Sequence, residues 1–286
     1  MNSIFKNSIT MDCSAKINLA LDVVGEREDG YHEVELIYVE IPLKDKVTVA
    51  LREDGEIYLT CDDSTLPTDS GNIAYRAAEE FFKQAKLVAG ADICLEKKIP
   101  HGAGLAGGSA DAAGVLKALN ELTGDRLSQE ELMQIGARLG ADVPFCIIGG
   151  CAMGEGIGEV LTPLPPIEGF TYVIAKPKES VATAYVYKNL DIKNRPENLC
   201  VPAVAEGIRR GDWGMICENA ENILESVTAE DFPVICDIKN CLSSFGAMLS
   251  MMSGSGTSVF GVFEDAEIAK AAAEAVKEYT DTVYVV

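Results

Sequence analysis

A glycine-rich segment between a predicted strand and a predicted helix constrains the fold more than any other feature of the sequence. The strand is predicted at 91–95, and the glycine-rich segment runs from 96 to 108. A helix is predicted to begin near Ser109, because apolar residues then recur at helical spacing: Ala112, Val115, Leu116, Leu119 and Leu122. The chain therefore passes from a strand, through a glycine loop, directly into the N-terminus of a helix.

Within this loop, Gly102, Gly104 and Gly107 satisfy the spacing GxGxxG. The spacing alone is a weak indication of a dinucleotide site, and the second strand and acidic residue that such a site needs do not follow. A Walker A loop is excluded because Gly108 stands where its lysine would be. The further motifs of a protein kinase are also missing from the sequence.

A glycine loop followed at once by a helix N-terminus is nevertheless suited to an anion. Backbone N–H groups and the positive end of the helix dipole point at whatever fills the loop, and phosphate is the natural occupant. The simpler interpretation, which we favour less, is a tight turn whose glycines only permit close packing. Ser109 is either an ordinary helix cap or a hydroxyl next to a metal–phosphate group, and the first role does not exclude the second.

The composition limits the possible partners. Forty-five acidic and 24 basic residues give a formal net charge of −21. Nucleic acids and anionic membrane surfaces are therefore not expected as partners, because both need clustered positive charge on the protein. Nine scattered cysteines and only two histidines argue against a zinc site and are typical of a reducing compartment, so a cytoplasmic protein is predicted.

Strands and helices are mixed in both halves of the chain without a strict βαβ order, which favours two α+β domains over a doubly wound sheet. Strands are predicted at 17–23 (half-buried), 34–41, 46–51, 91–95 and 170–176, on both sides of 254–256, and at the C-terminal end. Helices are predicted at 72–86, from near 109, at 128–139, 201–210, 213–225, 231–244 and 266–279, and Ser128 and Glu131 are predicted to form a capping box for the third of them. Prolines at 163, 165 and 166 predict a boundary between domains 1–162 and 163–286.

A few polar residues stand out from their surroundings. Lys16 lies on the first predicted strand, Asp142 follows Gly140 and Ala141, and Tyr31 and His32 follow a glycine in a turn. Taken singly, each is most simply explained as solvent-facing: an edge-strand lysine, a loop carboxylate and an exposed turn.

Together, these segments resemble the GHMP kinase superfamily. Three of them match its three motifs: SAKINL at 14–19, PHGAGLAGGSADAA at 100–113 and MSGSGTSVF at 252–260. Two more, DGYHE at 29–33 and GADVPF at 140–145, narrow the match to the members that act on a cytidyl diphosphate sugar alcohol. The five segments occur in the order that the family has and extend over most of the chain.

The resemblance implies a two-lobed α+β fold, with an N-terminal lobe like domain 2 of ribosomal protein S5 and a C-terminal ferredoxin-like lobe. It implies ATP-dependent phosphorylation of the tertiary 2-hydroxyl of the substrate, in the non-mevalonate route to isoprenoid precursors. ATP is the expected phosphoryl donor and Mg²⁺ is expected with it, with no metal ligands assigned. The expected partners are these small molecules, and the expected state is a monomer or a weak homodimer.

The resemblance also implies roles for single residues. Asp142 would be the general base, and Lys16 would orient it and stabilise charge around the attacking oxygen. Asn72 would lie near the adenine. The triphosphate would be bound by the loop residues Pro100, His101, Gly102, Ala103, Gly104, Leu105, Ala106, Gly107, Gly108, Ser109 and Ala110.

The acceptor would be recognised by a second group of residues. Tyr31 would stack on the cytosine and His32 would hydrogen-bond to it, with Tyr187 as the second aromatic face. Asn18 would approach the erythritol part of the substrate.

The sequence departs from the family at two positions of the loop. Ala106 stands where many members have glycine, and Ala110 where many have a second serine, which removes one hydroxyl near the metal. The alternative function is that of another small-molecule kinase of the superfamily, acting on mevalonate or homoserine, and a non-catalytic protein of the same fold is a third possibility. Tyr31 and His32 favour the cytidyl substrate, while Lys16 and Asp142 favour catalysis.

Overall fold

The computed structural model of the chain describes residues 8–28 and 30–286. Asp29, the first residue of the DGYHE segment, lies outside the described residues. The chain forms two compact units. The first contains the described residues up to Ala15 together with Leu43–His101 and Ala106–Gly149, and the second contains Lys16–Pro42, Gly102–Leu105 and Gly150–Val286.

Two long strands, β1 (Ser8–Glu26) and β2 (His32–Arg52), pair with each other and contribute residues to both units. In the first unit, the C-terminal part of β2 pairs antiparallel with β4 (Gly90–Glu96). The other edge of β4 pairs in parallel with β3 (Ile57–Cys61). These strands form the sheet of the first unit.

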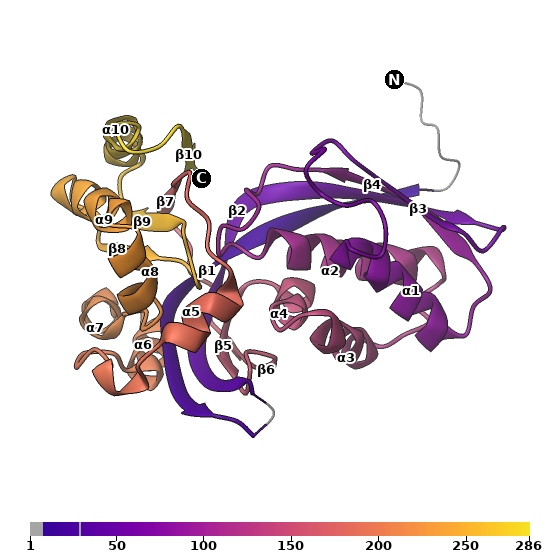
Figure 1. The fold of residues 1–286 in the computed structure, drawn as a ribbon, viewed down its shortest axis with the longest axis horizontal. Helices are drawn as coiled ribbons and strands as arrows, with labels where there is room; N and C mark the ends of the chain where they lie inside the picture. Colours follow the sequence, from indigo (N-terminus) through magenta and orange to yellow (C-terminus); the bar gives the residue numbers. More distant parts are fainter. Residues whose placement is uncertain (1–7, 29) are drawn as a thin grey trace. The chain divides into compact units, whose positions relative to one another are not determined.

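The helices of the first unit are α1 (Ile73–Ala85), α2 (Gly107–Leu122), α3 (Gln129–Leu139) and α4 (Val143–Ile148). Figure 1 shows them on one side of β3 and β4. The predicted apolar stripe of α2 is confirmed, since Ala112, Val115, Leu116 and Leu119 are fully buried. The predicted capping box of α3 is also present, with Ser128 and Glu131 each bonded to the other's backbone N–H.

In the second unit, the N-terminal part of β2 pairs with β5 (Cys151–Glu155), and β5 pairs with β6 (Val160–Leu164). A separate four-stranded antiparallel sheet has the order β10 (Thr282–Val285), β7 (Thr171–Lys176), β9 (Val259–Phe263) and β8 (Leu249–Met252). Two helices pack against this sheet, α9 (Val234–Ser244) and α10 (Ala266–Val276) (Figure 1). The predicted α+β class is confirmed.

The rest of the second unit consists of short helices. They are α5 (Thr183–Asn189), the 3₁₀ turn η1 (Ile192–Asn194), α6 (Val201–Arg210), α7 (Trp213–Asn219) and α8 (Glu225–Asp231). In the part of the chain that the structure describes, no helix combines the length and the apolar composition that crossing a membrane requires.

Several predicted elements are wrong in extent. Residues 34–41 and 46–51 belong to one strand, β2. Pro42 lies between the part of β2 that pairs with β5 and the part that pairs with β4, so the N–H that proline lacks interrupts neither ladder. The predicted helix 213–225 ends at Asn219, since residues 221–223 pair with Leu21 of β1 instead. The predicted helix 231–244 begins only after Pro233, and α2 begins at Gly107, two positions before Ser109.

The largest correction concerns burial of the first strand. Its predicted half-buried character is wrong, because residues 15–23 are buried on both faces of β1. The face that alternation assigned to solvent carries Lys16, Asn18 and Asp22, all at most 4% exposed. Buried polar groups require partners, so this face of β1 is where a site is expected.

Candidate active site

The glycine loop enters α2 through a series of left-handed residues. The φ angles of Gly102, Gly104 and Ala106 are +62°, +72° and +58°, and Gly107 begins the helix directly afterwards. Left-handed residues in a turn let successive backbone N–H groups converge on one hollow, which is how backbone nests bind anions. Ala106 adopts this conformation with a Cβ, which costs about 1–2 kcal/mol relative to glycine.

The tip of the loop is fixed within the second unit by its carbonyl groups. The Gly104 carbonyl oxygen accepts hydrogen bonds from Lys16 Nζ at 3.1 Å and from Ser253 Oγ at 3.0 Å. The Leu105 carbonyl accepts from the Lys16 backbone N–H at 3.1 Å. A Cβ at Gly104 would lie 2.0 Å from the Ser253 carbonyl oxygen, so this close approach requires glycine.

Lys16 and Asn18 form the polar centre of this part of the site. Lys16 Nζ donates to Asn18 Oδ1 at 2.8 Å and lies 5.6 Å from the centroid of the Tyr38 ring. The edge-strand explanation of Lys16 is thereby excluded. Asn18 Nδ2 is buried and has no hydrogen-bond partner among the described residues, which leaves a donor for a ligand.

The segment 253–258 is held by side chains that the sequence analysis did not identify. Asn222 Nδ2 donates to the carbonyl oxygens of Met252 at 2.9 Å and Gly254 at 2.8 Å. Thr228 Oγ1 donates to the Ser255 carbonyl at 3.1 Å. No local pattern marked Asn222, because its function depends on the pairing of its neighbours with β1.

In the first unit, Asp142 is the N-cap residue of α4, and it is half-buried. Its carbonyl oxygen accepts from the Cys146 N–H at 3.1 Å. Ser109 Oγ lies 3.9 Å from the position that a Cβ on Gly140 would occupy, so the hydroxyl at the start of α2 adjoins the turn before α4. Lys16 belongs to the second unit, and its pairing with Asp142 stays a prediction.

The structure brings two of the predicted acceptor-binding residues together. The rings of His32, at the start of β2, and Tyr187, on α5, have centroids 5.0 Å apart and an interplanar angle of 38°. Tyr31, which directly precedes His32 in the sequence, is 60% exposed. An imidazole with an adjacent phenol ring is suited to a planar heteroaromatic ligand.

An ion pair between the partly exposed Arg195 and the buried Asp22 holds the chain that follows Tyr187. Arg195 Nη2 lies 2.6 Å from Asp22 Oδ2 and donates to the Leu199 carbonyl at 2.7 Å. Burial raises the pKa of Asp22, and Arg195 partly opposes that rise. Burial is the main cause that raises the pKa of Glu35, and the negative charge of Asp22 raises it further. The signal that could have indicated this pair was an aspartate in an otherwise apolar strand.

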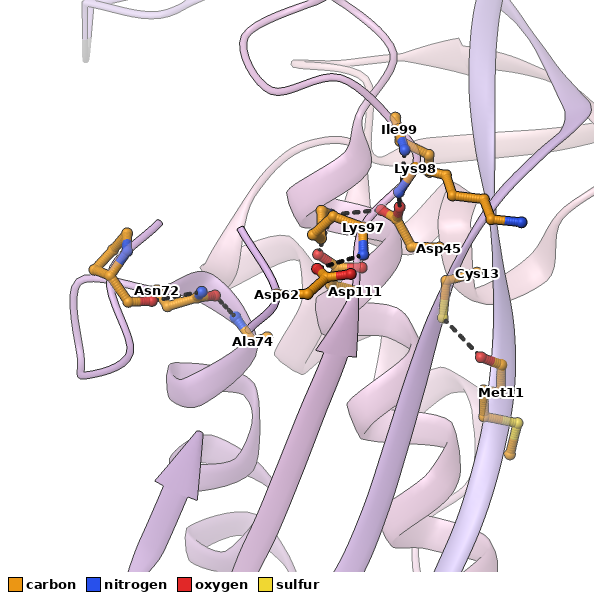
Figure 2. Close-up of polar contacts among 11 residues, drawn as sticks. Met11, Cys13, Asp45, Asp62, Asn72, Ala74, Lys97, Lys98, Ile99 and Asp111 are labelled. Carbon is orange, nitrogen blue, oxygen red and sulfur yellow. Dashed lines mark hydrogen bonds and ion pairs between the residues drawn. The ribbon is translucent and has the colours of Figure 1, made fainter. Parts of the chain in front are cut away.

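Asn72 has a structural function in the first unit. Its Oδ1 accepts from the Ala74 N–H at 3.0 Å, which caps α1 (Figure 2). Its Nδ2 donates to the Pro67 carbonyl at 2.9 Å. Its predicted place near an adenine stays a prediction. Figure 2 also shows a buried cluster of Lys97, Asp45 and Asp111, which the sequence analysis did not identify.

Comparison with known proteins gives consistent results. Residues 72–150 match the family described as GHMP kinases N terminal domain, and residues 204–281 match GHMP kinases C terminal. A 4-diphosphocytidyl-2-C-methyl-D-erythritol kinase of Acetivibrio thermocellus is 49% identical over 94% of this chain and 95% of its own length.

Solved structures agree with these matches. A crystal structure of 4-(cytidine 5'-diphospho)-2C-methyl-D-erythritol kinase has a TM-score of 0.81 and 34% identity, covering 97% of this chain and 98% of its own. The crystal structure of homoserine kinase from Cytophaga hutchinsonii has a TM-score of 0.78 and 23% identity, covering 100% of this chain and 96% of its own. At this identity the likeness shows the shared fold only.

The loop geometry predicts a difference between two alanine substitutions. Gly104→Ala and Gly102→Ala both place a side chain at a positive φ, which costs about 1–2 kcal/mol. Only at Gly104 does the new Cβ meet backbone, whereas at Gly102 the nearest atom is 3.8 Å away. Gly104→Ala should therefore lower the free energy of unfolding by a further ~1–3 kcal/mol in urea titrations. Equal losses in the two variants would show that the loop tip is not packed as described.

Proposed function

This chain belongs to the family of 4-diphosphocytidyl-2-C-methyl-D-erythritol kinases, and we propose that it transfers the γ-phosphoryl group of ATP to the 2-hydroxyl of 4-diphosphocytidyl-2-C-methyl-D-erythritol. The reaction is a step in the synthesis of isoprenoid precursors. The single observation that carries the proposal is the Gly104 carbonyl, which fixes both the glycine loop and the Lys16 ammonium.

ATP binds through the loop from Pro100 to Ala110. The left-handed residues and the N-terminus of α2 support a triphosphate position there, since both present backbone N–H groups. Asn72 caps α1 in the same unit as the start of α2, which supports a place for it near the nucleotide. The loop supplies positive potential that the formal charge of −21 does not count.

Phosphoryl transfer requires in-line positioning and charge stabilisation more than covalent chemistry by the protein. The oxygen of the 2-hydroxyl attacks the γ-phosphorus, its proton passes to the Asp142 carboxylate, and the bond to the β-phosphate oxygen breaks to release ADP. Lys16, held by Asn18 and Gly104, stabilises negative charge at the attacking oxygen. Its burial supports this function, because a charge out of water acts more strongly.

Mg²⁺ accompanies the triphosphate and neutralises part of its charge when bound. The described residues contain no group of three or more His, Cys, Asp or Glu side chains that could hold a metal by themselves. This fits Mg²⁺, which is commonly held by phosphate oxygens, water and one or two protein oxygens. The Ser109 hydroxyl, in the first turn of α2, is the protein oxygen that would suit it.

The cytidyl group binds at His32 and Tyr187, with Tyr31 stacking on the cytosine. The contact between the first two rings supports this position. Asn18 Nδ2 supports an additional hydrogen bond to the erythritol part. We also propose the domain boundary between 162 and 163, a cytoplasmic location, a monomer or weak homodimer, and no nucleic-acid partner.

The acceptor is tested directly by measuring ATP consumption with 4-diphosphocytidyl-2-C-methyl-D-erythritol, mevalonate and homoserine in separate reactions. Turnover is expected with the cytidyl compound alone. Turnover of mevalonate or homoserine instead would move the chain to a different substrate within the same fold. Without turnover of any of them, the catalytic proposal would be rejected.

Replacing the base removes the proton acceptor and preserves the shape of the side chain. Asp142→Asn should lower kcat by about 10²–10⁴-fold while the dissociation constant of ATP stays within about twofold. The matched control is Asp125→Asn, an exposed aspartate in the same unit, which should retain wild-type kcat. Near-normal turnover by Asp142→Asn would exclude Asp142 as the base.

The aromatic site is tested with two exposed tyrosines, Tyr31 and Tyr58. Base stacking on an aromatic ring contributes about 1–3 kcal/mol, so Tyr31→Ala should raise KM for the cytidyl substrate at least about fivefold. KM for ATP should not change. Tyr58→Ala, which removes a ring packed on Arg52 in the first unit, should leave both KM values unchanged. An unchanged cytidyl KM in Tyr31→Ala would refute the stacking role.

A further inference from the structure

Three charged side chains of the first unit meet in its interior. Lys97 Nζ forms ion pairs with Asp45 Oδ2 and Asp111 Oδ2, as Figure 2 shows. The three side chains are 8%, 0% and 3% exposed. None of them belongs to the residues to which the proposed reaction assigns a function.

These residues join the two ends of the glycine loop. Lys97 follows β4 and precedes Pro100–Ala110, the part of the loop to which ATP binding is assigned, whereas Asp111 follows that part within α2, 14 positions after Lys97. The ion pair between them therefore closes the loop at its base. Lys97 Nζ also lies 3.6 Å from the position of a Cβ on Gly107, which places the ammonium beside the first residue of α2.

Asp45 fixes the incoming chain independently of Lys97. Its Oδ1 accepts from the backbone N–H groups of Lys98 at 2.5 Å and Ile99 at 2.8 Å. The Lys97 N–H donates to Asp62 Oδ1 at 2.9 Å. Residues 97–99 are thus held by hydrogen bonds up to the residue before Pro100, the first residue to which ATP binding is assigned.

The charge balance of the cluster is unusual for a purely stabilising contact. Two buried carboxylates share one ammonium, and Asp111 Oδ1 has no hydrogen-bond partner in the described part of the chain. Burial raises the pKa of Asp111, Lys97 opposes the rise, and Asp45 adds to it. Buried ion pairs contribute little net stability compared with apolar side chains, so geometric specificity is the better explanation for this one.

We propose that Lys97, Asp45 and Asp111 are positioning residues for ATP, which hold residues 97–99 and the first turns of α2 at the spacing that the triphosphate requires. The inference rests on the proposed binding of ATP by the glycine loop. The three side chains act through the loop backbone, and the position of the cytidyl substrate does not depend on them.

The test compares two neighbouring lysines. Lys97→Met keeps an unbranched side chain one atom shorter and removes its charge, and Lys98→Met makes the same change at an exposed position. The dissociation constant of a non-hydrolysable ATP analogue is measured by calorimetry, and KM for each substrate by steady-state kinetics. Lys97→Met should weaken analogue binding and raise KM for ATP at least about tenfold, since small displacements of a positioning group have large effects. In Lys97→Met, KM for the cytidyl substrate should stay within about twofold of its wild-type value. In Lys98→Met, the dissociation constant of the ATP analogue and KM for ATP should also stay within about twofold of wild type.

Asp111→Asn keeps the test decisive if Lys97→Met does not fold. In wild type, Asp111 retains its proton at pH values where the unfolded chain has lost it, so its contribution to stability falls as pH rises above about 4. Asp111→Asn has no titrating group at this position, so its stability does not fall with pH for this reason. Its melting temperature relative to wild type should therefore rise between about pH 5 and pH 8, while its affinity for the ATP analogue falls. A relative melting temperature that rises with pH, together with weaker ATP binding, would distinguish positioning from a merely structural role.

Three results would overturn the inference: unchanged ATP affinity in Asp111→Asn, equal loss of affinity for both substrates, or equal effects of Lys97→Met and Lys98→Met. Failure of the proposed function is seen separately, because wild type itself would then not bind the ATP analogue.

Discussion

The second unit's part of the site depends on the carbonyl oxygen of Gly104, which accepts hydrogen bonds from Lys16 and Ser253 at once. Because Gly104 has no side chain, the loop tip can pack backbone against backbone on the segment 253–258. The same oxygen orients the ammonium that the proposed reaction needs. Loop position and lysine position are therefore set by one atom, and Asn222 extends this arrangement by holding Gly254.

Buried charges, rather than the net charge, define the chemistry of this acidic chain. Lys97 compensates Asp45 and Asp111 in the first unit, and Arg195 compensates Asp22 in the second. Each buried carboxylate needs its cation, because an unpaired buried charge would be costly. The pairing in turn holds the cation's chain segment in place, close in the sequence to a proposed binding residue. The formal charge of −21 describes the whole sequence and does not predict the potential where the proposed anionic substrates bind.

The elements that the sequence predicted well are those whose signals are local. The stripe of α2 and the capping box of α3 lie within a few residues, and both were found. The errors lie where a distant partner decides. Pro42 is tolerated inside β2 because different strands pair on either side of it, and residues 221–223 leave the helix to pair with β1. The short strands β3, β5 and β6 were not predicted, because five residues carry too weak a pattern.

The sequence by itself determined the glycine loop, the family motifs and the identity of the candidate residues, since these are written in short contiguous segments. Only the tertiary structure decided that the polar face of β1 is buried and that the His32 ring meets Tyr187. It also decided that Asp45 reaches Lys97, 52 positions away. These contacts depend on strand register and on packing between segments far apart in the chain, and a local sequence pattern contains neither.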